Sequence, residues 1–452
     1  MRTKFGLRCP VIFTDHHNCH AYSAYYTAGF PDASVITLDG GGDGLCSRVY
    51  RVRSGRFEQL NSLNSYHSIG NYYAYITKIC GFTAHKHEGK ITGLAARGEP
   101  VFKTLLEQMI SYENGNFRNR GNCYFWSAVA KIRKALPEDF QIADLAASMQ
   151  AVLEAAVVPY CDYWVKKSGI GHVALVGGVF ANVLLNQKIH NLESVKSLFI
   201  HPGMGDEGLS FGAAFSLTEA GVDWDESLVA TPIPNVYLGP EYSTDEIKHV
   251  LEARGVKFTY EDDIEMQVAR RLADGSVVAR FNGRMEYGPR ALGNRSILYQ
   301  PTDSSANDWL NKKMQRTEFM PFAPAVKFDL ADQCFYGITG AEHTAKFMTI
   351  TFDCTDEMKR LCPGVVHVDG TARPQLVTPE INPSYFAIID NYYKLTGIPS
   401  IINTSFNVHE EPIVCTPDDA VNGFLKIGLD YLAIGPFLVE NPEGAVRRNI
   451  RK

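Results

Sequence analysis

A pair of histidines, followed by a strand-like run and several glycines, constrains this chain more than any other stretch of its sequence. His16 and His20 have the i, i+4 spacing that puts two side chains on one face of a helix. Neutral imidazoles at that spacing form half of a metal site, which a carboxylate can complete. Asp39 ends the apolar run 35–38, and residues 40–44 are mostly glycine, whose N–H groups can approach phosphate oxygens. This segment therefore predicts a metal site beside a phosphate cradle.

Each part of this segment also has a plainer interpretation. Two histidines at helical spacing are more often core or surface residues than ligands, and a glycine run after a strand is usually a tight turn. The order of the parts favours the functional interpretation, because the histidine pair, the strand, the aspartate and the glycines follow one another in sequence. Cys19 lies between the two histidines, so a thiolate ligand stays open.

Composition places the chain among ordinary globular proteins with more than one domain. Its 452 residues, 45% of them hydrophobic and 21% charged, are enough for two or more buried cores. The net charge of −6 gives no overall attraction to nucleic acid or to anionic membranes, so we expect neither as a partner. No apolar run is expected to reach transmembrane length, and no signal-peptide core follows Met1. The 10 cysteines lack a C-x-x-C pair, which predicts reduced thiols and a cytoplasmic protein.

Two further strand exits in the first half are expected to carry polar groups. An amphipathic helix within 137–167 leads to the apolar strand 173–176 and then to the pair Gly177–Gly178. A glycine pair between a buried strand and a helix is a natural site for ribose and phosphate groups. The pattern recurs at the strand 197–200, after which Asp206 supplies a second carboxylate on a strand-exit loop.

The second half contains an arginine-rich loop that suits an anion. Prolines between 218 and 242 interrupt the preceding pattern, so we place the domain boundary there. Arg284, Arg290 and Arg295 then follow a predicted strand at 277–281, with glycines between them. The planar guanidinium group matches the paired oxygens of phosphate or carboxylate. A solvated basic loop is the alternative, but the apolar residues in this loop suit exposure poorly, and an anion pocket is favoured.

Three other polar positions are candidates for the same chemistry. Arg373 ends the polar cluster His-Val-Asp-Gly-Thr-Ala-Arg, and Asn403 and Ser405 follow an apolar strand on what is expected to be a strand-exit loop. Amide and hydroxyl groups on such a loop can hold a small polar substrate. Lys90, between glycines, can reach a phosphate as a point charge, although its spacing alone favours a solvated loop lysine.

Six segments, in this order, resemble the NodU/CmcH family of carbamoyltransferases. They read HHNCHAYSAYY from His16, LDGGGDG from Leu38, HEGKITGLAARGEP from His87, GPRALGNRSIL from Gly288, HVDGTARPQ from His367 and NTSFN from Asn403. The resemblance runs across nearly the whole chain, and the motifs keep the family's order on either side of the expected domain gap.

This resemblance implies an α/β fold with two domains. Residues 1–225 would form an ASKHA-type (actin-like ATPase) carbamoyl-transfer domain with an incomplete first lobe, and residues 240–452 a YrdC-like domain that forms carbamoyl adenylate. The implied activity is that of an ATP-dependent O-carbamoyltransferase. It would join carbamoyl phosphate to ATP and pass the carbamoyl group from the adenylate to a hydroxyl of a small molecule or glycan. The chain could also form a homodimer.

The resemblance also implies roles for individual residues. The metal ligands would be His16, His20, Asp39 and Asp206, around a divalent ion that is commonly Fe(II), with Mg or Mn as alternatives. The residues around ATP or adenylate would be Gly41, Gly42, Lys90, Gly177, Gly178, Asn182 and Asn186. The residues that bind carbamoyl phosphate and nucleotide would be Arg290, Arg295, Arg373, Asn403 and Ser405. The catalytic residues would be His16, His20, Asp39, Arg290 and Arg373. The general base that takes the proton of the acceptor hydroxyl is not assigned, and His17 and a metal-bound group are the two candidates.

Two departures from the family pattern accompany these expectations. Family members carry roughly a hundred more residues before the histidine pair, a length that corresponds to a lobe of domain size. We therefore expect either that the sequence is a shortened form of a longer chain or that its transfer step is impaired. Met314 and Met320 stand where the family often has a lysine and an arginine, and Lys312, Lys313 and Arg316 are the candidates to replace them.

Two alternative functions stay open on the sequence alone. One is an ASKHA ATPase of tRNA threonylcarbamoylation, which the GPRALGNRS and NTSFN segments and the lack of a broad basic face disfavour. The other is a nucleotide-binding relic without catalysis.

Overall fold

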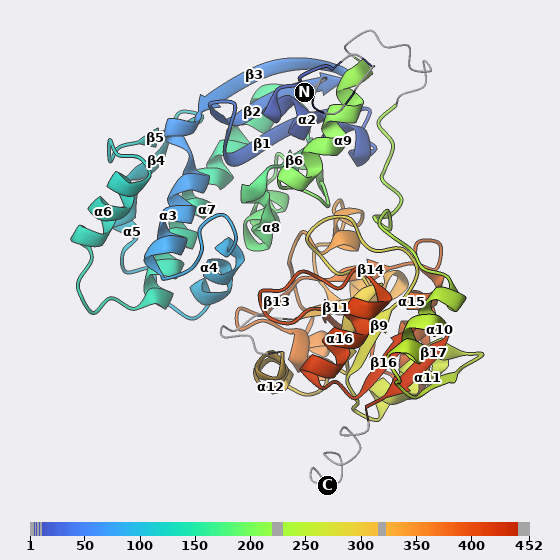
Figure 1. Cartoon of the computed structure of the whole chain (residues 1–452). Coiled ribbons are helices and arrows are strands. Elements are labelled where there is room, and N and C mark those ends of the chain that lie inside the picture. Colours follow the sequence, from blue (N-terminus) through green and yellow to red (C-terminus); the bar gives the residue numbers. More distant parts are fainter. Residues whose placement is uncertain are drawn as a thin grey trace.

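The computed structural model describes residues 11–218, 229–314 and 322–441, preceded by Lys4, Gly6 and Cys9. The strands of this part of the chain form a five-stranded sheet, an eight-stranded sheet and two small two-stranded sheets. Figure 1 shows the five-stranded sheet with its helices as the blue-to-green upper body, and the eight-stranded sheet with its helices as the yellow-to-red lower body. The mixture of helices and strands in both bodies confirms the expected α/β class.

The first sheet combines an antiparallel hairpin series with parallel strands. Its order is β3-β2-β1-β6-β7. The strands are β1 (Asp32–Gly42), β2 (Leu45–Arg53), β3 (Arg56–Asn64), β6 (His172–Val176) and β7 (Ser197–Ile200). Strands β1, β2 and β3 pair antiparallel, whereas β6 pairs parallel with β1 and β7 parallel with β6. Because β1, β6 and β7 run in the same direction, their carboxyl ends and the loops that follow lie at one edge of the sheet.

Helices cover both faces of this first sheet. Alternate residues of β1 face opposite sides, so that Val35 packs with α2 (His16–Ala28), while Ile36 packs with α3 (Ile69–Ile79) and α7 (Ile142–Ser168). Helix α9 (Leu209–Phe215) packs along α2. The remaining elements of this body are α4 (Glu88–Ala95), α5 (Lys103–Glu107), β4 (Ile110–Glu113), β5 (Asn116–Asn119), α6 (Trp126–Ala135) and α8 (Val183–His190).

Helix α7 corrects the expectation that no apolar run reaches transmembrane length. Among the helices of the described residues, α7 is the one long and apolar enough to cross a membrane by length and composition. In its most apolar window 56% of the helix is buried inside the protein. Met149, Leu153 and Val157 of α7 are in the core of the first body, and α7 packs against α3, α4 and α8. Packing inside the body therefore accounts for these apolar residues.

The second sheet carries the arginine-rich loop. Its order is β14-β11-β15-β10-β9-β16-β17-β8. The strands are β8 (Phe258–Tyr260), β9 (Val278–Phe281), β10 (Arg295–Tyr299), β11 (Ala323–Lys327), β14 (Gln375–Val377), β15 (Ser400–Ser405), β16 (Tyr431–Ile434) and β17 (Phe437–Glu440). Helices α11 (Ile264–Ala273) and α15 (Pro383–Thr396) share a core with this sheet, and α16 (Pro417–Ile427) packs on β9 and β16 and contacts α10 (Thr244–Ala253). Smaller elements are α12 (Ala306–Lys313), α13 (Ala331–Cys334), α14 (Asp356–Leu361), β12 (Phe352–Asp353) and β13 (Thr371–Ala372).

One local prediction for this sheet is wrong. Asn403 and Ser405 were expected on a loop after a strand, but they are inside β15, where Leu298 pairs with Asn403 and Ser296 with Ser405. The reason is that the Asn403 amide finds a buried partner, the Gln375 Oε1 atom at 2.8 Å, so that the strand continues through a polar residue.

The two bodies touch along β7 and α8. The Leu198 N–H donates to the Gly340 carbonyl at 2.8 Å, and the Asn186 amide donates to the Thr349 carbonyl at 2.7 Å. The Phe199 ring stacks on His343 with ring centroids 5.2 Å apart. The predicted domain boundary near residue 225 falls in 219–228, outside the described residues, and the division at 225 and 240 stays a prediction.

Candidate functional site

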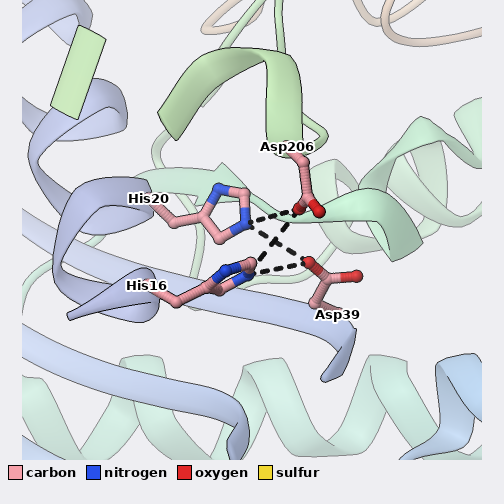
Figure 2. Close-up of side chains that lie close together, drawn as sticks. All are labelled: His16, His20, Asp39 and Asp206. Carbon is pink, nitrogen blue, oxygen red and sulfur yellow. Dashed lines mark hydrogen bonds and ion pairs between the residues drawn. The ribbon is translucent and has the colours of Figure 1, made fainter. Parts of the chain in front are cut away.

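Four side chains meet at the edge of the first sheet where the parallel strands end (Figure 2). The Nε2 atoms of His16 and His20 each lie 3.3 Å from Asp39 Oδ2. The same atoms lie 3.7 and 3.6 Å from Asp206 Oδ1. One donor atom from each residue lies within 4.8 Å of all the others. The structure therefore brings together the four residues that the resemblance names as metal ligands.

Local structure explains why these groups converge. Asp15 caps α2 by accepting the Asn18 N–H at 3.0 Å, which starts the helix so that His16 and His20 share its inner face. The β1–β2 register shifts between Leu38 and Gly42, which indicates a bulge beside Asp39. A Cβ atom at Gly42 would clash with the His16 ring, so only glycine fits beside this ligand. Asp206 comes from the loop after β7 and is the most exposed of the four, with 70% of its side chain accessible.

Charge balance at the centre favours a cation between the four groups. Burial alone would lower the pKa of His20, but hydrogen bonds from its ring to the carboxylates of Asp206 and Asp39 outweigh burial and raise that pKa above its ordinary value. Burial alone would raise the pKa of Asp39, but hydrogen bonds with His16 and His20 outweigh it and lower that pKa strongly. The two carboxylates thus stabilise positive charge on His20, and a divalent ion bound here would replace the proton.

The donor set fits a divalent metal. Two imidazole nitrogens and two carboxylate oxygens suit Fe(II), Mn or Zn, and oxygen-rich completion by other ligands favours Fe(II) or Mn over a structural zinc site. His17 is turned away, with its Nδ1 atom 2.8 Å from Thr37 Oγ1, and burial lowers its pKa to about 4. Cys19 is not part of this group, and burial raises its pKa to about 11, which disfavours a thiolate ligand.

The predicted phosphate cradle is only partly a loop. Gly41 and Gly42 are in β1 itself, and the turn comes at residues 43–44. Gly177 follows β6 with φ +107°, and a Cβ atom there would clash with the Leu38 carbonyl, so glycine lets β6 leave the sheet against β1. A Cβ atom at Gly178 would lie 3.3 Å from Asp39 Oδ1. These glycines therefore border the Asp39 side of the metal centre.

Three polar residues predicted to surround the nucleotide have protein partners in this structure. The Asn182 Oδ1 atom accepts the Leu185 N–H at 3.1 Å and caps α8, and its amide donates to Gln150 at 2.7 Å. The Asn186 amide spans the contact between the two bodies. Lys90 is buried in α4, with its Nζ atom 3.9 Å from Glu410 of the second body, so the interpretation as a solvated loop lysine is wrong.

Arg290 and Arg373 form a pair of half-buried cations in the second body. Burial lowers the pKa of Arg290 to about 10, with Glu207 of the first body opposing that shift. Burial, and then the charge of Arg290, lower the pKa of Arg373 well below its ordinary value. In the described part of the chain neither guanidinium group has a hydrogen-bond or ion-pair partner, and Arg290 Nε is buried. Two cations that are removed from water and repel each other would be stabilised by an anion bound between them.

Arg295, in contrast, has hydrogen-bond partners for its guanidinium group. Its side chain is fully buried, and its Nη atoms donate to the carbonyls of Asn282, Asn294, Pro240 and Gly283 at 2.9 to 3.2 Å. Its guanidinium group lies 3.7 Å from the centre of the Phe281 ring. Glu286 completes this frame by accepting the N–H groups of Leu292, Asn294 and Arg295. Arg295 therefore holds the arginine-rich loop in shape, whereas the resemblance places it among the substrate ligands.

The other second-body candidates have mixed surroundings. Asn403 donates to Gln375 and Ala291, and its buried Oδ1 atom has no hydrogen-bond partner, whereas the Ser405 hydroxyl donates to Asn407 at 2.6 Å. Met314 is buried in the core, and Arg316 and Met320 lie outside the described residues.

Sequence reasoning missed the residues that join the two sites. Glu207 follows Asp206 and interacts electrostatically with Arg290. Tyr287, in the arginine-rich loop, has its hydroxyl 3.1 Å from His201 Nε2 in the loop after β7. His367 lies near Arg373, and burial lowers its pKa to about 4. In the sequence, these residues are marked only by lying beside a predicted residue in the same motif. Residue spacing does not indicate which residues of other elements they contact.

Family models match both halves of the chain. The model described as Carbamoyltransferase N-terminus matches residues 1–215, and the one described as Carbamoyltransferase C-terminus matches residues 269–441. The chain belongs to the carbamoyltransferase family. It is an enzyme of that class, and the predicted resemblance is confirmed.

Relatives match this carbamoyltransferase over most of its length. An uncharacterized protein of Methanocaldococcus jannaschii is 34% identical over 95% of this chain and 83% of its own length. Nodulation protein NolO of Bradyrhizobium diazoefficiens is 33% identical over 94% of this chain and 78% of its own. Nodulation protein NolNO of Sinorhizobium fredii is 34% identical over 95% of this chain, which spans 64% of that relative.

One solved structure is a weaker match to the carbamoyltransferase. Full-length HypF in its phosphate- and nucleotide-bound form is 19% identical and aligns with 40% of this chain and 22% of its own, with a TM-score of 0.30. A TM-score at this level carries no argument about fold or ligands.

The metal centre predicts a selective loss of metal binding. His20→Ala removes a donor, and we expect the Mn²⁺ affinity of the carbamoyltransferase to fall on the order of 100-fold or more. Even the loss of a residue that only hydrogen-bonds to a metal ligand lowers metal affinity about 10- to 100-fold. His17→Gln is the matched control, since His17 is the neighbouring buried histidine and faces Thr37. Electron paramagnetic resonance of free Mn²⁺ measures both affinities. Equal affinities for the two variants would contradict the assignment of His20.

The frame around Arg295 predicts a loss of stability. Arg295→Met leaves several buried carbonyls without donors, so we expect the midpoint of thermal unfolding to fall on the order of 6–10 °C, which corresponds to about 3 kcal/mol. Arg254→Met is the control, because Arg254 pairs with Asp418 on the exposed surface, and little change is expected. Scanning calorimetry compares the two. A similar midpoint for Arg295→Met and the unsubstituted chain would show that the loop does not depend on Arg295.

Proposed function

We propose that the chain is an O-carbamoyltransferase that uses carbamoyl phosphate and ATP, through carbamoyl adenylate, to modify a hydroxyl of a small molecule or glycan. The observation that carries this proposal is the position of Arg290 and Arg373, which have no hydrogen-bond or ion-pair partner among the described residues. Arg290 interacts with Glu207, the residue after the metal-site carboxylate Asp206, so an anion site and a candidate metal centre adjoin where the two bodies meet. A reaction with two phosphate-containing substrates needs both kinds of site.

The second body is proposed to carry out adenylation. Water releases phosphate from carbamoyl phosphate and leaves carbamate, whose oxygen then attacks the α-phosphorus of ATP with loss of pyrophosphate. Both steps move negative charge between oxygens, and the Arg290–Arg373 pair can neutralise that charge in a desolvated pocket. The Asn403 Oδ1 atom, buried without a partner, can accept a hydrogen bond from the carbamoyl amide. Charge neutralisation and positioning are then the main tasks of the protein.

The first body is proposed to carry out transfer. The acceptor oxygen attacks the carbamoyl carbon, AMP leaves from that carbon, and the hydroxyl proton is lost. When a divalent ion is bound, it supplies Lewis-acid stabilisation of charge on oxygen. His16, His20, Asp39 and Asp206 would hold the ion, for which we propose Fe(II), with Mn or Mg as alternatives. The glycines at the ends of β1 and β6 place no side chains beside Asp39, and the phosphate of the adenylate is proposed to bind along their main chain.

The finer fold assignments are part of this proposal. We propose that residues 1–225 form an ASKHA-type domain and residues 240–452 a YrdC-like domain. The convergence of strand exits from β1, β6 and β7 on one ligand-bearing edge supports the first assignment, because open α/β sheets bind ligands outside the carboxyl ends of their strands. The ten free cysteines support a reducing, cytoplasmic setting, and neither nucleic acid nor membrane is a proposed partner.

The arginine pair predicts which substitution stops adenylation. Arg290→Ala or Arg373→Ala should lower carbamoyl-phosphate-dependent pyrophosphate release about 30- to 1,000-fold, the equivalent of about 2–4 kcal/mol of transition-state stabilisation. Arg284→Ala is the control, because Arg284 is exposed in the same loop and donates to the Leu238 and Gly239 carbonyls. A coupled pyrophosphate assay measures all three variants. Unchanged release in both Arg290→Ala and Arg373→Ala would refute the assignment.

The division of labour predicts that the two steps separate. His20→Ala alters the metal centre but leaves Arg290 and Arg373 in place, so pyrophosphate release should continue while carbamoyl transfer is lost. Transfer is followed with radiolabelled carbamoyl phosphate and a panel of sugars and aminocyclitols as hydroxyl acceptors. If His20→Ala loses both steps to the same extent, the two bodies do not act separately. If the unsubstituted chain forms no carbamoyl adenylate, the enzymatic proposal fails in favour of a nucleotide-binding relic.

A further inference from the structure

A continuous chain of hydrogen bonds connects the arginine-rich loop of the second body to the helix that carries His16 and His20. The Tyr287 hydroxyl lies 3.1 Å from His201 Nε2, and His201 Nδ1 lies 3.0 Å from Thr27 Oγ1. The Thr27 hydroxyl lies 2.5 Å from the Ser23 carbonyl, and the Ser23 hydroxyl lies 2.8 Å from the His20 carbonyl. We call Tyr287, His201, Thr27 and Ser23 the relay. It begins three residues before Arg290 and ends on the main chain of a metal-site histidine.

The direction of each hydrogen bond in the relay is determined. Thr27 donates its one hydroxyl proton to the Ser23 carbonyl, so it must accept from His201 Nδ1–H. His201 is fully buried, and burial, followed by the charge of His20, lowers its pKa to about 3, so its ring is neutral. A neutral ring with its proton on Nδ1 has an acceptor at Nε2, and Tyr287 must therefore donate there. Both ring nitrogens of His201 are thus hydrogen-bonded, and only one arrangement of donors achieves this.

Close packing restricts movement of the relay residues relative to the segments around them. A Cβ atom at Gly203 would clash with the Tyr287 ring, so the loop after β7 and the arginine-rich loop touch with no intervening side chain. The Tyr287 ring also packs on Phe211 of α9, with ring centroids 4.9 Å apart. The loop after β7 carries Asp206, and α9 packs along α2. A shift of Tyr287 is therefore transmitted to both segments that supply metal-site residues.

We propose that Tyr287 and His201 are positioning residues that couple the occupancy of the Arg290–Arg373 pair to the affinity of the metal centre. This inference rests on the proposed function, because it assumes an anion site at the arginines and a divalent ion at the four donors. An anion that orders the arginine-rich loop fixes Tyr287, and the relay then fixes α2 and Asp206 around the ion. Linkage makes the effect reciprocal, so that the metal centre also strengthens anion binding. The transfer site is thereby completed when the arginine site is filled.

Binding measurements test the coupling without any catalytic assay. Mn²⁺ is titrated into the full chain by electron paramagnetic resonance, with and without inorganic phosphate as the anion. We expect phosphate to raise the Mn²⁺ affinity of the unsubstituted chain by about fivefold or more, a usual size for coupling between sites. Tyr287→Phe removes only the hydroxyl that donates to His201. It should reduce the phosphate effect to less than about twofold, while Mn²⁺ affinity without phosphate stays within about twofold of the unsubstituted chain.

Matched variants separate positioning from a general structural role. Tyr237→Phe removes a hydroxyl that donates to the Leu292 carbonyl of the same loop but lies outside the relay, and it should keep the phosphate effect. His201→Gln retains a donor and an acceptor and should restore part of an effect that His201→Leu abolishes. Arg290→Ala should abolish the effect by removing the anion site, whereas phosphate acting directly on the metal would leave it intact.

The outcomes distinguish this inference from the proposed function. If the unsubstituted chain binds no Mn²⁺, the proposed metal centre is wrong, and the proposed coupling is wrong as well. If it binds Mn²⁺ with no response to phosphate, the coupling alone is overturned. The coupling is equally overturned if Tyr287→Phe and His201→Leu respond to phosphate as strongly as the unsubstituted chain. A phosphate effect that survives Arg290→Ala would overturn the role given to the arginine pair.

Discussion

The convergence of two imidazoles and two carboxylates at one sheet edge is the interaction on which the rest of this structure depends. Buried histidine and aspartate side chains cost free energy unless they are paired, and here each Nε2 atom lies within 3.7 Å of both carboxylates. The parallel direction of β1, β6 and β7 places Asp39, near the end of β1, and Asp206, in the loop after β7, at the same edge of the sheet. Helix α2 then adds two donors from one face. Removing α2 would leave Asp39 and Asp206 without these imidazole partners.

The second body meets this edge through a loop that is itself rigidly held. Glu286 accepts hydrogen bonds from three main-chain N–H groups, and the Arg295 side chain donates to four main-chain carbonyls, so the loop shape does not depend on a ligand. With its main chain hydrogen-bonded in this way, the loop can present Arg290 with no hydrogen-bond partner in the part of the chain that the structure describes. The contact of Tyr287 with the loop after β7 then joins the proposed anion site to the proposed metal centre. In a carbamoyltransferase this arrangement puts the two proposed half-reactions side by side.

Much of the local structure could be predicted from the sequence, because periodicity and glycine positions report on single elements. The helix with His16 and His20, the strand β6 and helix α7 all form within a few residues of the predicted positions. The four metal-site residues were named together only through the family resemblance, since spacing relates His16 to His20 but not to Asp206. Partners on distant elements carry no such signal. The burial of Lys90, the hydrogen bonds from Arg295 to main-chain carbonyls and the location of Asn403 inside a strand are therefore seen only in the structure.

The central claim is that these four donors hold one divalent ion at the exit of the parallel strands. Anomalous diffraction from crystals of the full chain grown with Mn²⁺, recorded on both sides of the manganese edge, tests it most directly. The account predicts a single strong peak within bonding distance, about 2.0–2.3 Å, of His16 Nε2, His20 Nε2 and an Asp39 oxygen, with Asp206 bound directly or through water. A manganese peak elsewhere, or none near the two histidines in protein that is shown to contain manganese, would contradict it.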